Sequence, residues 1–264
     1  MVFVAGLPGT GKSLVIHQLA HLAVAAGRSV HLLQWDVARP VFETSPAGRR
    51  YPVVDGVTQP MVRKAVGLWA RRALVAWARR HPEPAHLLLG ETPFVGGRLI
   101  ELARPASDPA EPLLSAPTCR FVIPVPSTQV RRVVEAERER RATRPVHPRE
   151  AEDAPPQVLR DLWRELYAVA GRLGLGGTTS PDAPYDPEIY RRVYESVLAR
   201  RHAEVVRLDT VLPTGALSVY DFAVAHASLV PGGDEADAAV RETEARHPDA
   251  AALARDVERW WTAV

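Results

Sequence analysis

Residues 6–13 read Gly-Leu-Pro-Gly-Thr-Gly-Lys-Ser and fit the spacing G-x-x-x-x-G-K-[ST] of loops that bind phosphate groups. Glycines let the backbone turn so that several N–H groups point at one anion, and a helix directly behind the loop adds favourable positive potential. In such a loop Lys12 is expected to contact the β- and γ-phosphates of a nucleotide, and the Ser13 hydroxyl to bind Mg²⁺. We therefore predict a phosphate-binding site formed by Gly6, Gly9, Thr10, Gly11, Lys12 and Ser13.

The segments on either side of this loop have the pattern that the motif requires. An apolar run over residues 1–5 predicts a short buried strand, and the stretch from Ser13 to about Ala26 predicts a helix. Of the 33 Lys and Arg residues only Lys12 and Lys64 are lysines, and one of them occupies the lysine position of the motif. The context therefore favours a true phosphate-binding loop over a chance glycine-rich turn.

Apolar runs and helical patterns alternate along most of the chain, which predicts a parallel sheet with helices on both faces. Asp186-Pro187 predicts a helix start, and Asp249 is expected to cap the last helix. The Pro-rich stretch Ala103–Pro117 predicts a surface loop. The expected buried strands are Val2–Ala5, Ser29–Trp35, His86–Gly90, Cys119–Val125 and Ala203–Leu208.

The second expected strand leads into Asp36, and Arg39 follows three residues later. Ligands of parallel α/β sheets bind at the carboxyl ends of the strands, so both side chains are expected near the phosphate loop. Asp36 is a candidate general base for an acceptor hydroxyl that attacks the γ-phosphate, and Arg39 a candidate for binding an anionic group. The alternatives are that Asp36 only caps a turn and that Arg39 is solvated or pairs with Asp36.

The third expected strand is followed by Glu91 and then by Gly96-Gly97-Arg98. An acidic residue after such a strand is expected to bind Mg²⁺ through water, and Glu91 is the best candidate for this position. Arg98 is a candidate substrate contact, and an ordinary loop arginine is the alternative.

The fourth expected strand leads into a helix that becomes rich in arginine towards its far end. Mixed charges on a helix usually form a solvated face, but this helix follows a strand whose end faces the phosphates. A mobile cover over about residues 131–157 would stabilise charge on a transferring phosphoryl group and exclude water. The candidate lid residues are Arg138, Arg141 and Arg144.

Composition sets limits on the class of protein. With 46% hydrophobic and 24% charged residues over 264 positions, the chain has the composition of an ordinary globular protein, and we expect a single domain over residues 1–264. A net charge of +2 does not by itself indicate a nucleic-acid or membrane partner. The sequence has one cysteine, Cys119, and we recognise neither a signal peptide nor an apolar stretch long enough to span a membrane. We therefore expect a cytoplasmic location and no membrane partner. The sequence predicts no oligomeric state.

Over roughly residues 1–210, the phosphate-loop motif and the residues after the expected strands make the chain resemble the P-loop kinase group. This group includes nucleotide, shikimate, gluconate and adenylylsulfate kinases. The resemblance implies a P-loop three-layer α/β sandwich with a five-stranded parallel sheet in the order 2-3-1-4-5 and an arginine-bearing lid. Asp36-x-x-Arg39 is similar to the motif of 5′-hydroxyl polynucleotide kinases, in which the aspartate is the general base and the arginine contacts a substrate phosphate. Zeta-toxin-like and aminoacyl-tRNA kinases have a similar outline. About residues 216–264 form an extra C-terminal segment, for which we expect helices.

These observations predict a kinase that transfers the γ-phosphate of Mg·ATP to an acceptor hydroxyl. Lys12, Asp36 and Arg39 are the expected catalytic residues, and either ATP or GTP fits the motif. The acceptor is a nucleic-acid 5′-hydroxyl or the hydroxyl of a small metabolite, nucleoside or antibiotic. A nucleotide-dependent switch or assembly ATPase is the alternative from another class, and Asp36 would then have no catalytic role.

Overall fold

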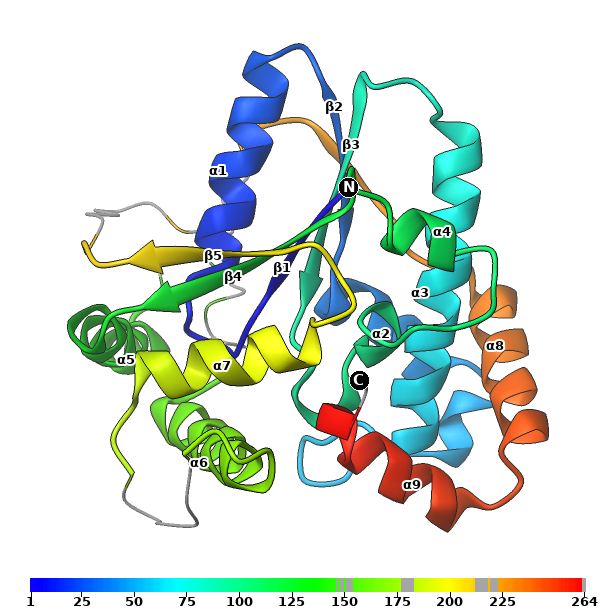
Figure 1. Ribbon diagram of the computed structural model, residues 1–264. Coiled ribbons are helices and arrows are strands. Elements are labelled where there is room, and N and C mark those ends of the chain that lie inside the picture. The colour runs from blue at the N-terminus through cyan, green and yellow to red at the C-terminus, as the bar shows by residue number, and fades with distance from the viewer. Residues whose placement is uncertain are drawn as a thin grey trace.

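The computed structural model describes residues 1–145, 147, 150, 154–176, 183–211, 218 and 223–262. Its centre is a sheet of six strands in the order β5-β4-β1-β3-β2-β6, in which every neighbouring pair is parallel (Figure 1). Parallel pairing needs crossover connections, and helices supply them. The strands are β1 (Val2–Ala5), β2 (Ser29–Leu33), β3 (His86–Thr92), β4 (Arg120–Pro126), β5 (Ala203–Leu208) and β6 (His226–Ser228).

The expectation of five strands was wrong, although the five expected strands do lie in the relative order 2-3-1-4-5. The additional strand, β6, pairs with β2 and places His226 beside Val30 and Ser228 beside Leu32. All three of its residues are exposed, so it has no apolar run that a sequence pattern would reveal. The C-terminal segment therefore contributes a strand as well as helices.

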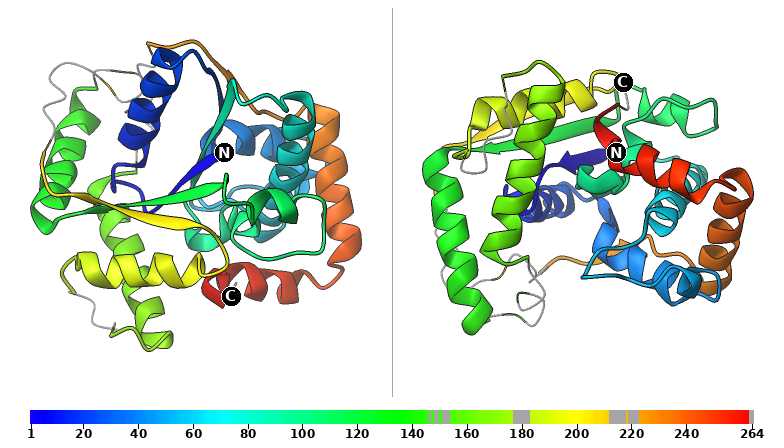
Figure 2. Two further views of the ribbon diagram at one scale, coloured as in Figure 1. Left: turned by 45° about the horizontal axis from the view of Figure 1, so that its top comes forward. Right: turned by 90° about the horizontal axis from the view of Figure 1, so that it is seen from below.

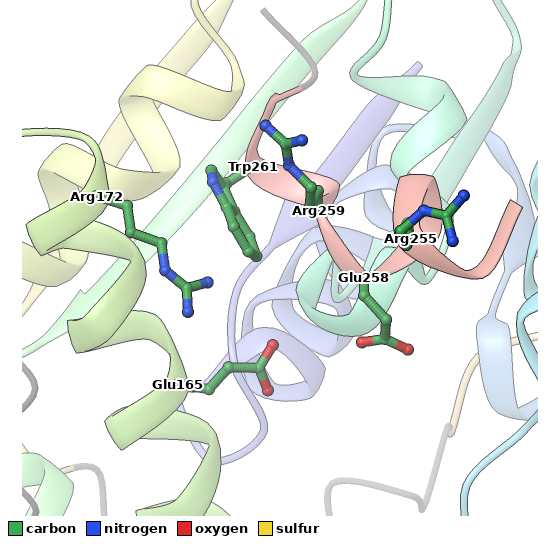
Figure 3. A pocket seen from close by; sticks show the side chains of 6 residues that line it. All are labelled: Glu165, Arg172, Arg255, Glu258, Arg259 and Trp261. Carbon is green, nitrogen blue, oxygen red and sulfur yellow. The ribbon is translucent and has the colours of Figure 1, made fainter. Parts of the chain in front are cut away.

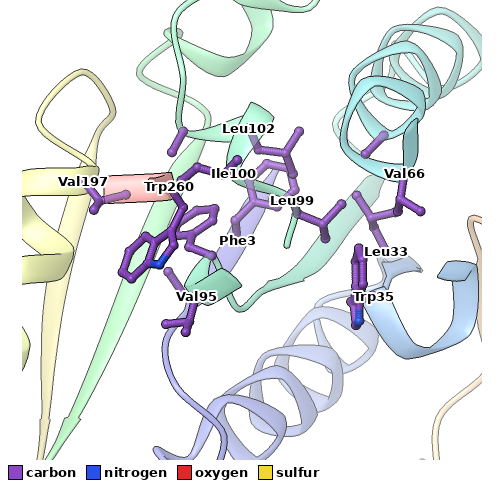
Figure 4. Close-up of a cluster of buried hydrophobic side chains, with 14 of the residues drawn as sticks. Phe3, Leu33, Trp35, Val66, Val95, Leu99, Ile100, Leu102, Val197 and Trp260 are labelled. Carbon is purple, nitrogen blue, oxygen red and sulfur yellow. The ribbon is translucent and has the colours of Figure 1, made fainter. Parts of the chain in front are cut away.

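The two faces of the sheet carry separate apolar clusters because successive residues of a strand point to opposite sides. Val4, Leu32 and Leu89 pack with Ile16 and Ala20 of helix α1 (Lys12–Ala25) on one face. Their neighbours Phe3, Leu33 and Leu88 belong to the larger cluster on the other face, part of which is drawn in Figure 4. The fifth expected strand is not buried as predicted: β5 lies at the edge of the sheet and is partly exposed.

Two of the helices begin at the caps that the sequence predicted. Asp186 Oδ1 accepts hydrogen bonds from the N–H groups of Glu188 (2.8 Å) and Ile189 (3.1 Å), and Asp249 caps its helix through the N–H of Ala252, so both predicted caps are confirmed. The longer helices after α1 are α2 (Trp35–Thr44), α3 (Pro60–Arg80), α5 (Thr128–Thr143), α6 (Pro156–Arg172), α7 (Pro187–Val197), α8 (Gly233–Arg246) and α9 (Ala250–Glu258). The shorter elements are α4 (Glu111–Leu114) and the 3-10 turns η1 (Gly48–Arg50), η2 (Val95–Gly97), η3 (Ile100–Leu102) and η5 (Trp260–Thr262).

The C-terminal helices pack against α3, on the side of the molecule opposite α5 (Figure 2). The indole N–H of Trp69 donates to Glu235 of α8 at 2.9 Å. Trp260 of η5 is fully buried in the main core, close to Val95 and Val197 (Figure 4). This segment is therefore integral to the fold. None of the helices in the described ranges is both long and apolar enough to cross a membrane.

The stretch predicted as a surface loop, Ala103–Pro117, is mostly exposed or partly exposed, contains the short helix α4 and is anchored by two buried arginines. Arg71 of α3 forms a two-pronged ion pair with Asp108 (2.6 and 2.8 Å) and also contacts Glu111. Arg201 donates to both carboxylate oxygens of Glu111, at 2.6 and 3.1 Å. The composition of the stretch gave no sign of this network, because its partners lie far away in sequence.

Candidate functional site

The loop Gly6–Ser13, called here the glycine loop, lies between the end of β1 and the start of α1. Gly9 (φ 73°) and Gly11 (φ 88°) adopt left-handed conformations that other residues rarely take, and Gly11 is the N-cap of α1. A Cβ at Gly11 would lie 2.8 Å from Leu208 Cδ1, and one at Gly6 would clash with the Tyr190 hydroxyl. The loop therefore needs glycine both for its turns and for its close contacts with β5 and α7.

Lys12 places its ammonium group inside the glycine loop. Its Nζ donates to the carbonyl of Leu7 at 2.9 Å and lies 3.2 Å from Glu91 Oε1, and the side chain is 5% exposed. Burial lowers the pKa of Lys12, and the charge of Glu91 opposes that shift. Thr10 Oγ1 donates to the same Leu7 carbonyl at 2.8 Å. The loop thus holds a cation next to the uncapped N-terminus of α1, an arrangement that attracts an anion.

Glu91 lies within β3, in register beside Val4 of β1, and not after the strand as its sequence suggested. The strand continues through Thr92. The structure brings together the predicted pair Lys12 and Glu91. Ser13, the second residue of α1, stays partly exposed.

Asp36 and Arg39 lie in helix α2, which begins at Trp35, so the prediction that Trp35 ends a strand was wrong. The exposed Asp36 carboxylate raises the pKa of both Lys12 and Arg98 through its charge, although burial lowers the pKa of each overall. Arg39 pairs with Glu43 at 3.3 Å rather than with Asp36. The carboxylate of Asp36 therefore faces solvent within electrostatic reach of the glycine loop.

Arg98 is held by a loop with unusual backbone geometry. Phe94 (φ 62°) and Leu99 (φ 59°) are buried non-glycine residues with positive φ, and they flank two glycines with positive φ. A positive φ at a non-glycine residue costs free energy, and this conformation persists only where the surrounding structure imposes it. The surroundings here include Arg63, which donates to the carbonyl of Gly96 and also pairs with Glu258 of α9.

The guanidinium of Arg98 makes no hydrogen bond or ion pair with another described residue. Burial lowers its pKa; the charge of Asp36 opposes that shift, and the nearby charges of Arg63 and Arg39 add to it. Three guanidinium groups therefore lie near one another at the carboxyl edge of the sheet. Arg63 and Arg39 are paired with Glu258 and Glu43, so Arg98 is the one of the three without such a pairing among the described residues, and it is suited to an anionic ligand.

Arg131 of α5 contacts the glycine loop, and sequence analysis did not single it out. It is 2% exposed and donates from Nη1 to the carbonyl of Pro8 at 2.9 Å, from Nη2 to the carbonyl of Leu159 at 3.3 Å and from Nε to Glu135 at 2.8 Å. Its position in the first turn of the helix after β4 was the available signal, because that turn lies at the carboxyl edge of the sheet.

The predicted lid arginines have different surroundings. Arg138 donates to the carbonyl of Ala154 at 2.9 Å, and its charge contributes to the lowered pKa of Lys12 after the larger effect of burial. Arg141 pairs with Glu137 and with the buried Glu150. Arg144 is exposed at the end of α5. Part of the predicted lid, residues 146, 148–149 and 151–153, lies outside the described residues.

A cavity of about 390 Å³ opens between α6 and the C-terminal segment (Figure 3). The Arg172 guanidinium lies 4.8 Å from the ring centre of Trp261, and Glu165 accepts a hydrogen bond from the indole of Trp260 at 3.3 Å. Burial raises the pKa of Glu165, and the charge of Arg98 opposes that shift, which connects the cavity to the arginine cluster. The lining residues are Glu165, Arg172, Arg255, Glu258, Arg259 and Trp261.

Comparisons with family models, with curated proteins and with solved structures found no match to this chain. The site is therefore interpreted from its own geometry.

Proposed function

We propose that the chain is a P-loop kinase that transfers the γ-phosphate of Mg·ATP to an acceptor hydroxyl. The observation that carries this proposal is the position of Lys12, with its ammonium buried inside a loop of positive-φ glycines, next to a helix N-terminus and 3.2 Å from Glu91. Carbonyl and carboxylate contacts hold this cation in place until a phosphate replaces them. A nucleoside triphosphate satisfies both the cation and the N–H groups of the first helical turn.

The residues around the loop fit a magnesium ion. The Ser13 hydroxyl and the Glu91 carboxylate are hard oxygen ligands of the kind Mg²⁺ prefers, and Glu91 would bind it through water. When bound with the nucleotide, Mg²⁺ neutralises negative charge on the β- and γ-phosphate oxygens. Lys12 then contributes a positive charge at the same oxygens, and Arg131 keeps Pro8 of the loop in place.

Asp36 is the proposed general base. Its carboxylate is exposed at the edge of the loop and sits within the field of Lys12 and Arg98. It would take the proton of the acceptor hydroxyl as that oxygen attacks the γ-phosphorus, and the nucleoside diphosphate would leave. Arg138, which affects Lys12 electrostatically, is the lid residue best placed to stabilise the transferring group.

The surroundings of Asp36 support a small anionic acceptor over a polynucleotide. Arg98 has no anionic partner in hydrogen-bonding contact among the described residues, and the neighbouring cavity of about 390 Å³ has the size of a small-molecule site. Arg172, which lines this cavity, would bind the anionic group of such an acceptor, and the positive charge of Arg98, which reaches Glu165 of the lining, would add to the attraction. A nucleic-acid 5′-hydroxyl and a nucleotide-dependent switch are the alternatives that the experiment below distinguishes.

The test is Mg·ATP binding by calorimetry, followed by transfer of labelled γ-phosphate to a 5′-hydroxyl oligonucleotide and to a panel of hydroxylated small anions. Lys12→Met is expected to abolish nucleotide binding. Asp36→Asn is expected to keep binding and to lose transfer by a factor of 10² or more, as for removal of a general base. Arg98→Lys is expected to raise the KM for the acceptor while the affinity for ATP stays the same.

Two results would contradict parts of this proposal. Hydrolysis of ATP that is unchanged in Asp36→Asn, with no transfer to any acceptor, would support the switch alternative. Failure of the wild-type protein to bind Mg·ATP would reject the kinase proposal itself.

A further inference from the structure

Three histidines from three separate elements meet at the end of the sheet opposite the glycine loop. His31 lies in β2, His81 follows the last residue of α3, and His86 is the first residue of β3. One ring nitrogen from each lies within 4.8 Å of the other two. His31 Nε2 and His86 Nδ1 are 3.1 Å apart, and the ring centres of His81 and His86 are separated by 4.3 Å.

The fold itself imposes this arrangement. Strands β2 and β3 pair with Ser29 opposite His86 and with His31 opposite Leu88, which sets His31 and His86 diagonally on adjacent strands. Helix α3 ends at Arg80, and the capping residue His81 that follows it lies where the chain turns back to enter β3. The indole of Trp77, one turn earlier in α3, packs edge-on against His31 at 5.6 Å. Three chain segments therefore fix the three rings.

We propose that His31, His81 and His86 form a binding site for a divalent transition-metal ion of the Zn²⁺ class. Imidazole nitrogen is the ligand that suits Zn²⁺, Ni²⁺, Co²⁺ and Cu²⁺, and three histidines with one open position form a known type of zinc coordination. Zn–N bonds of about 2.0–2.1 Å place tetrahedral ligand atoms about 3.3 Å apart. The nitrogens of His31 and His86, 3.1 Å apart, are close to this separation, and the His81 nitrogen, within 4.8 Å of both, would have to move closer.

The surroundings match what such an ion requires. Glu83 Oε2 lies 4.0 Å from His86 Nε2, the nitrogen that faces away from His31. With His86 Nδ1 bound to the metal, its Nε2–H would donate to Glu83, the outer partner that metal-bound histidines usually have. His81 and His86 are partly exposed, so an ion can enter from solvent.

Position separates this site from the proposed kinase centre. His86 lies at the amino end of β3 and Glu91 near its carboxyl end, so the two sites lie towards opposite ends of one strand. Imidazoles also differ in ligand chemistry from the oxygen ligands proposed for Mg²⁺. The metal site therefore does not depend on the proposed function, and it would join β2, β3 and the end of α3.

The test uses the full chain without a histidine tag, stripped with EDTA and titrated with Zn²⁺ by calorimetry and with Co²⁺ by visible absorption. We expect one equivalent of Zn²⁺ to bind, the intense visible bands of tetrahedral Co²⁺ to appear, and the Tm to rise with Zn²⁺ concentration. His81→Asn is expected to weaken Zn²⁺ binding at least 100-fold and to remove the Co²⁺ bands. Glu83→Gln is expected to weaken binding about 10-fold.

The chain offers a matched control in the pair His17 and His21 of α1, whose Nε2 atoms are 3.3 Å apart. A His17→Asn/His21→Asn variant is expected to keep the high-affinity site. His81 is partly exposed at the end of a helix, and an unchanged Tm of His81→Asn in EDTA would show that the variant folds. The proposal is overturned if the wild-type protein binds no Zn²⁺, or if the His17/His21 variant, rather than His81→Asn, loses binding.

Discussion

At the scale of single residues, the glycine loop is held from outside by side chains of other elements. Arg131 donates to the carbonyl of Pro8, and Tyr190 of α7 lies against Gly6. These contacts define the position of the loop before any ligand binds. Preorganisation of this kind reduces the entropic cost of binding, so we expect nucleotide affinity to depend on residues that do not contact the phosphates.

Arg131→Lys tests this dependence. Lysine keeps the positive charge but cannot donate to Pro8, Leu159 and Glu135 at the same time. We expect the Kd for Mg·ATP to rise about 10-fold, equivalent to about 1.4 kcal/mol. Arg144→Lys on the exposed end of the same helix is the control and is expected to leave Kd unchanged. An unchanged Kd in Arg131→Lys would show that the charge of this residue, and not its hydrogen bonds, supports the loop. An equal rise in Kd for Arg144→Lys would show that the effect is not specific to the contacts of Arg131.

Gly67 provides a prediction about stability. It lies inside α3, where alanine would ordinarily stabilise the helix by about 1 kcal/mol. A Cβ at this position would overlap the carboxylate of Glu101, which is fully enclosed and pairs with Lys64 at 3.1 Å. We therefore expect Gly67→Ala to lower the free energy of unfolding by about 1–3 kcal/mol in urea titrations.

The comparison for this change is Gly233→Ala in the first turn of α8. No atom lies within 4 Å of a Cβ at Gly233, so the substitution is expected to be neutral or slightly stabilising. A Gly67→Ala protein as stable as the wild type would show that the Glu101 side chain can move aside without cost.

At the scale of elements, the segment with α4 is attached to the body of the protein by ion pairs rather than by apolar contacts alone. The side chain of Arg201 is completely buried and that of Arg71 is 2% exposed, and both contact Glu111. Removal of one member of a buried pair leaves an uncompensated charge, which costs about 3–5 kcal/mol. We expect Glu111→Gln to lower the free energy of unfolding at pH 7 by about 3 kcal/mol.

The same carboxylate predicts a pH dependence. Burial alone would raise the pKa of Glu111, but hydrogen bonds from Arg201 and Arg71 lower it to about 2, from an ordinary value of 4.5. Because the folded state binds its proton less readily than the unfolded state, this stabilisation is complete above about pH 4.5 and is lost as the pH falls towards 2. Urea titrations between pH 7 and 2.5 should show a steeper loss of stability for the wild type than for Glu111→Gln. Glu204→Gln, which affects a surface pair with Arg120, should follow the wild-type curve.

At the scale of the whole molecule, sequence patterns predicted the features that depend on residues close together in the sequence. The glycine loop, five strands close to their observed bounds and the caps at Asp186 and Asp249 depend on short stretches of sequence. Strand β6 depends on pairing with β2 across the chain, and its three exposed residues give no periodic signal.

Long-range contacts explain what the sequence did not predict in the candidate site. The contact of Arg131 with Pro8 joins residues that are far apart along the chain, and so does the pairing of Arg63 with Glu258. Arginine is abundant in this chain, so composition did not distinguish Arg131 from its neighbours in the same helix. The predicted Lys12, Glu91 and Asp36 were found near one another because the carboxyl ends of parallel strands lie at one edge.

The C-terminal segment formed by α9 and η5 contributes both to the core and to the loop that carries Arg98. Leu253, Val257 and Trp260 are at most 3% exposed, and a Cβ at Gly97 would lie 2.6 Å from Val257 Cγ1. Burial of each such side chain contributes about 1.5–3 kcal/mol, and the total stability of a domain is about 5–15 kcal/mol. We therefore expect a chain that ends at Pro248 to lose cooperative unfolding.

Val257→Ala tests the contact of α9 with the Arg98 loop in a protein that still folds. The cavity left beside Gly97 is expected to lower the free energy of unfolding by about 2 kcal/mol. Val230→Ala, at a position that is 43% exposed, is expected to change it by less than about 0.5 kcal/mol. Because Val257 packs against the loop that carries Arg98, its loss should raise the KM for an anionic acceptor and leave the Kd for Mg·ATP unchanged. A truncated chain that unfolds cooperatively at the wild-type Tm would show that α9 is an appendage rather than part of the core.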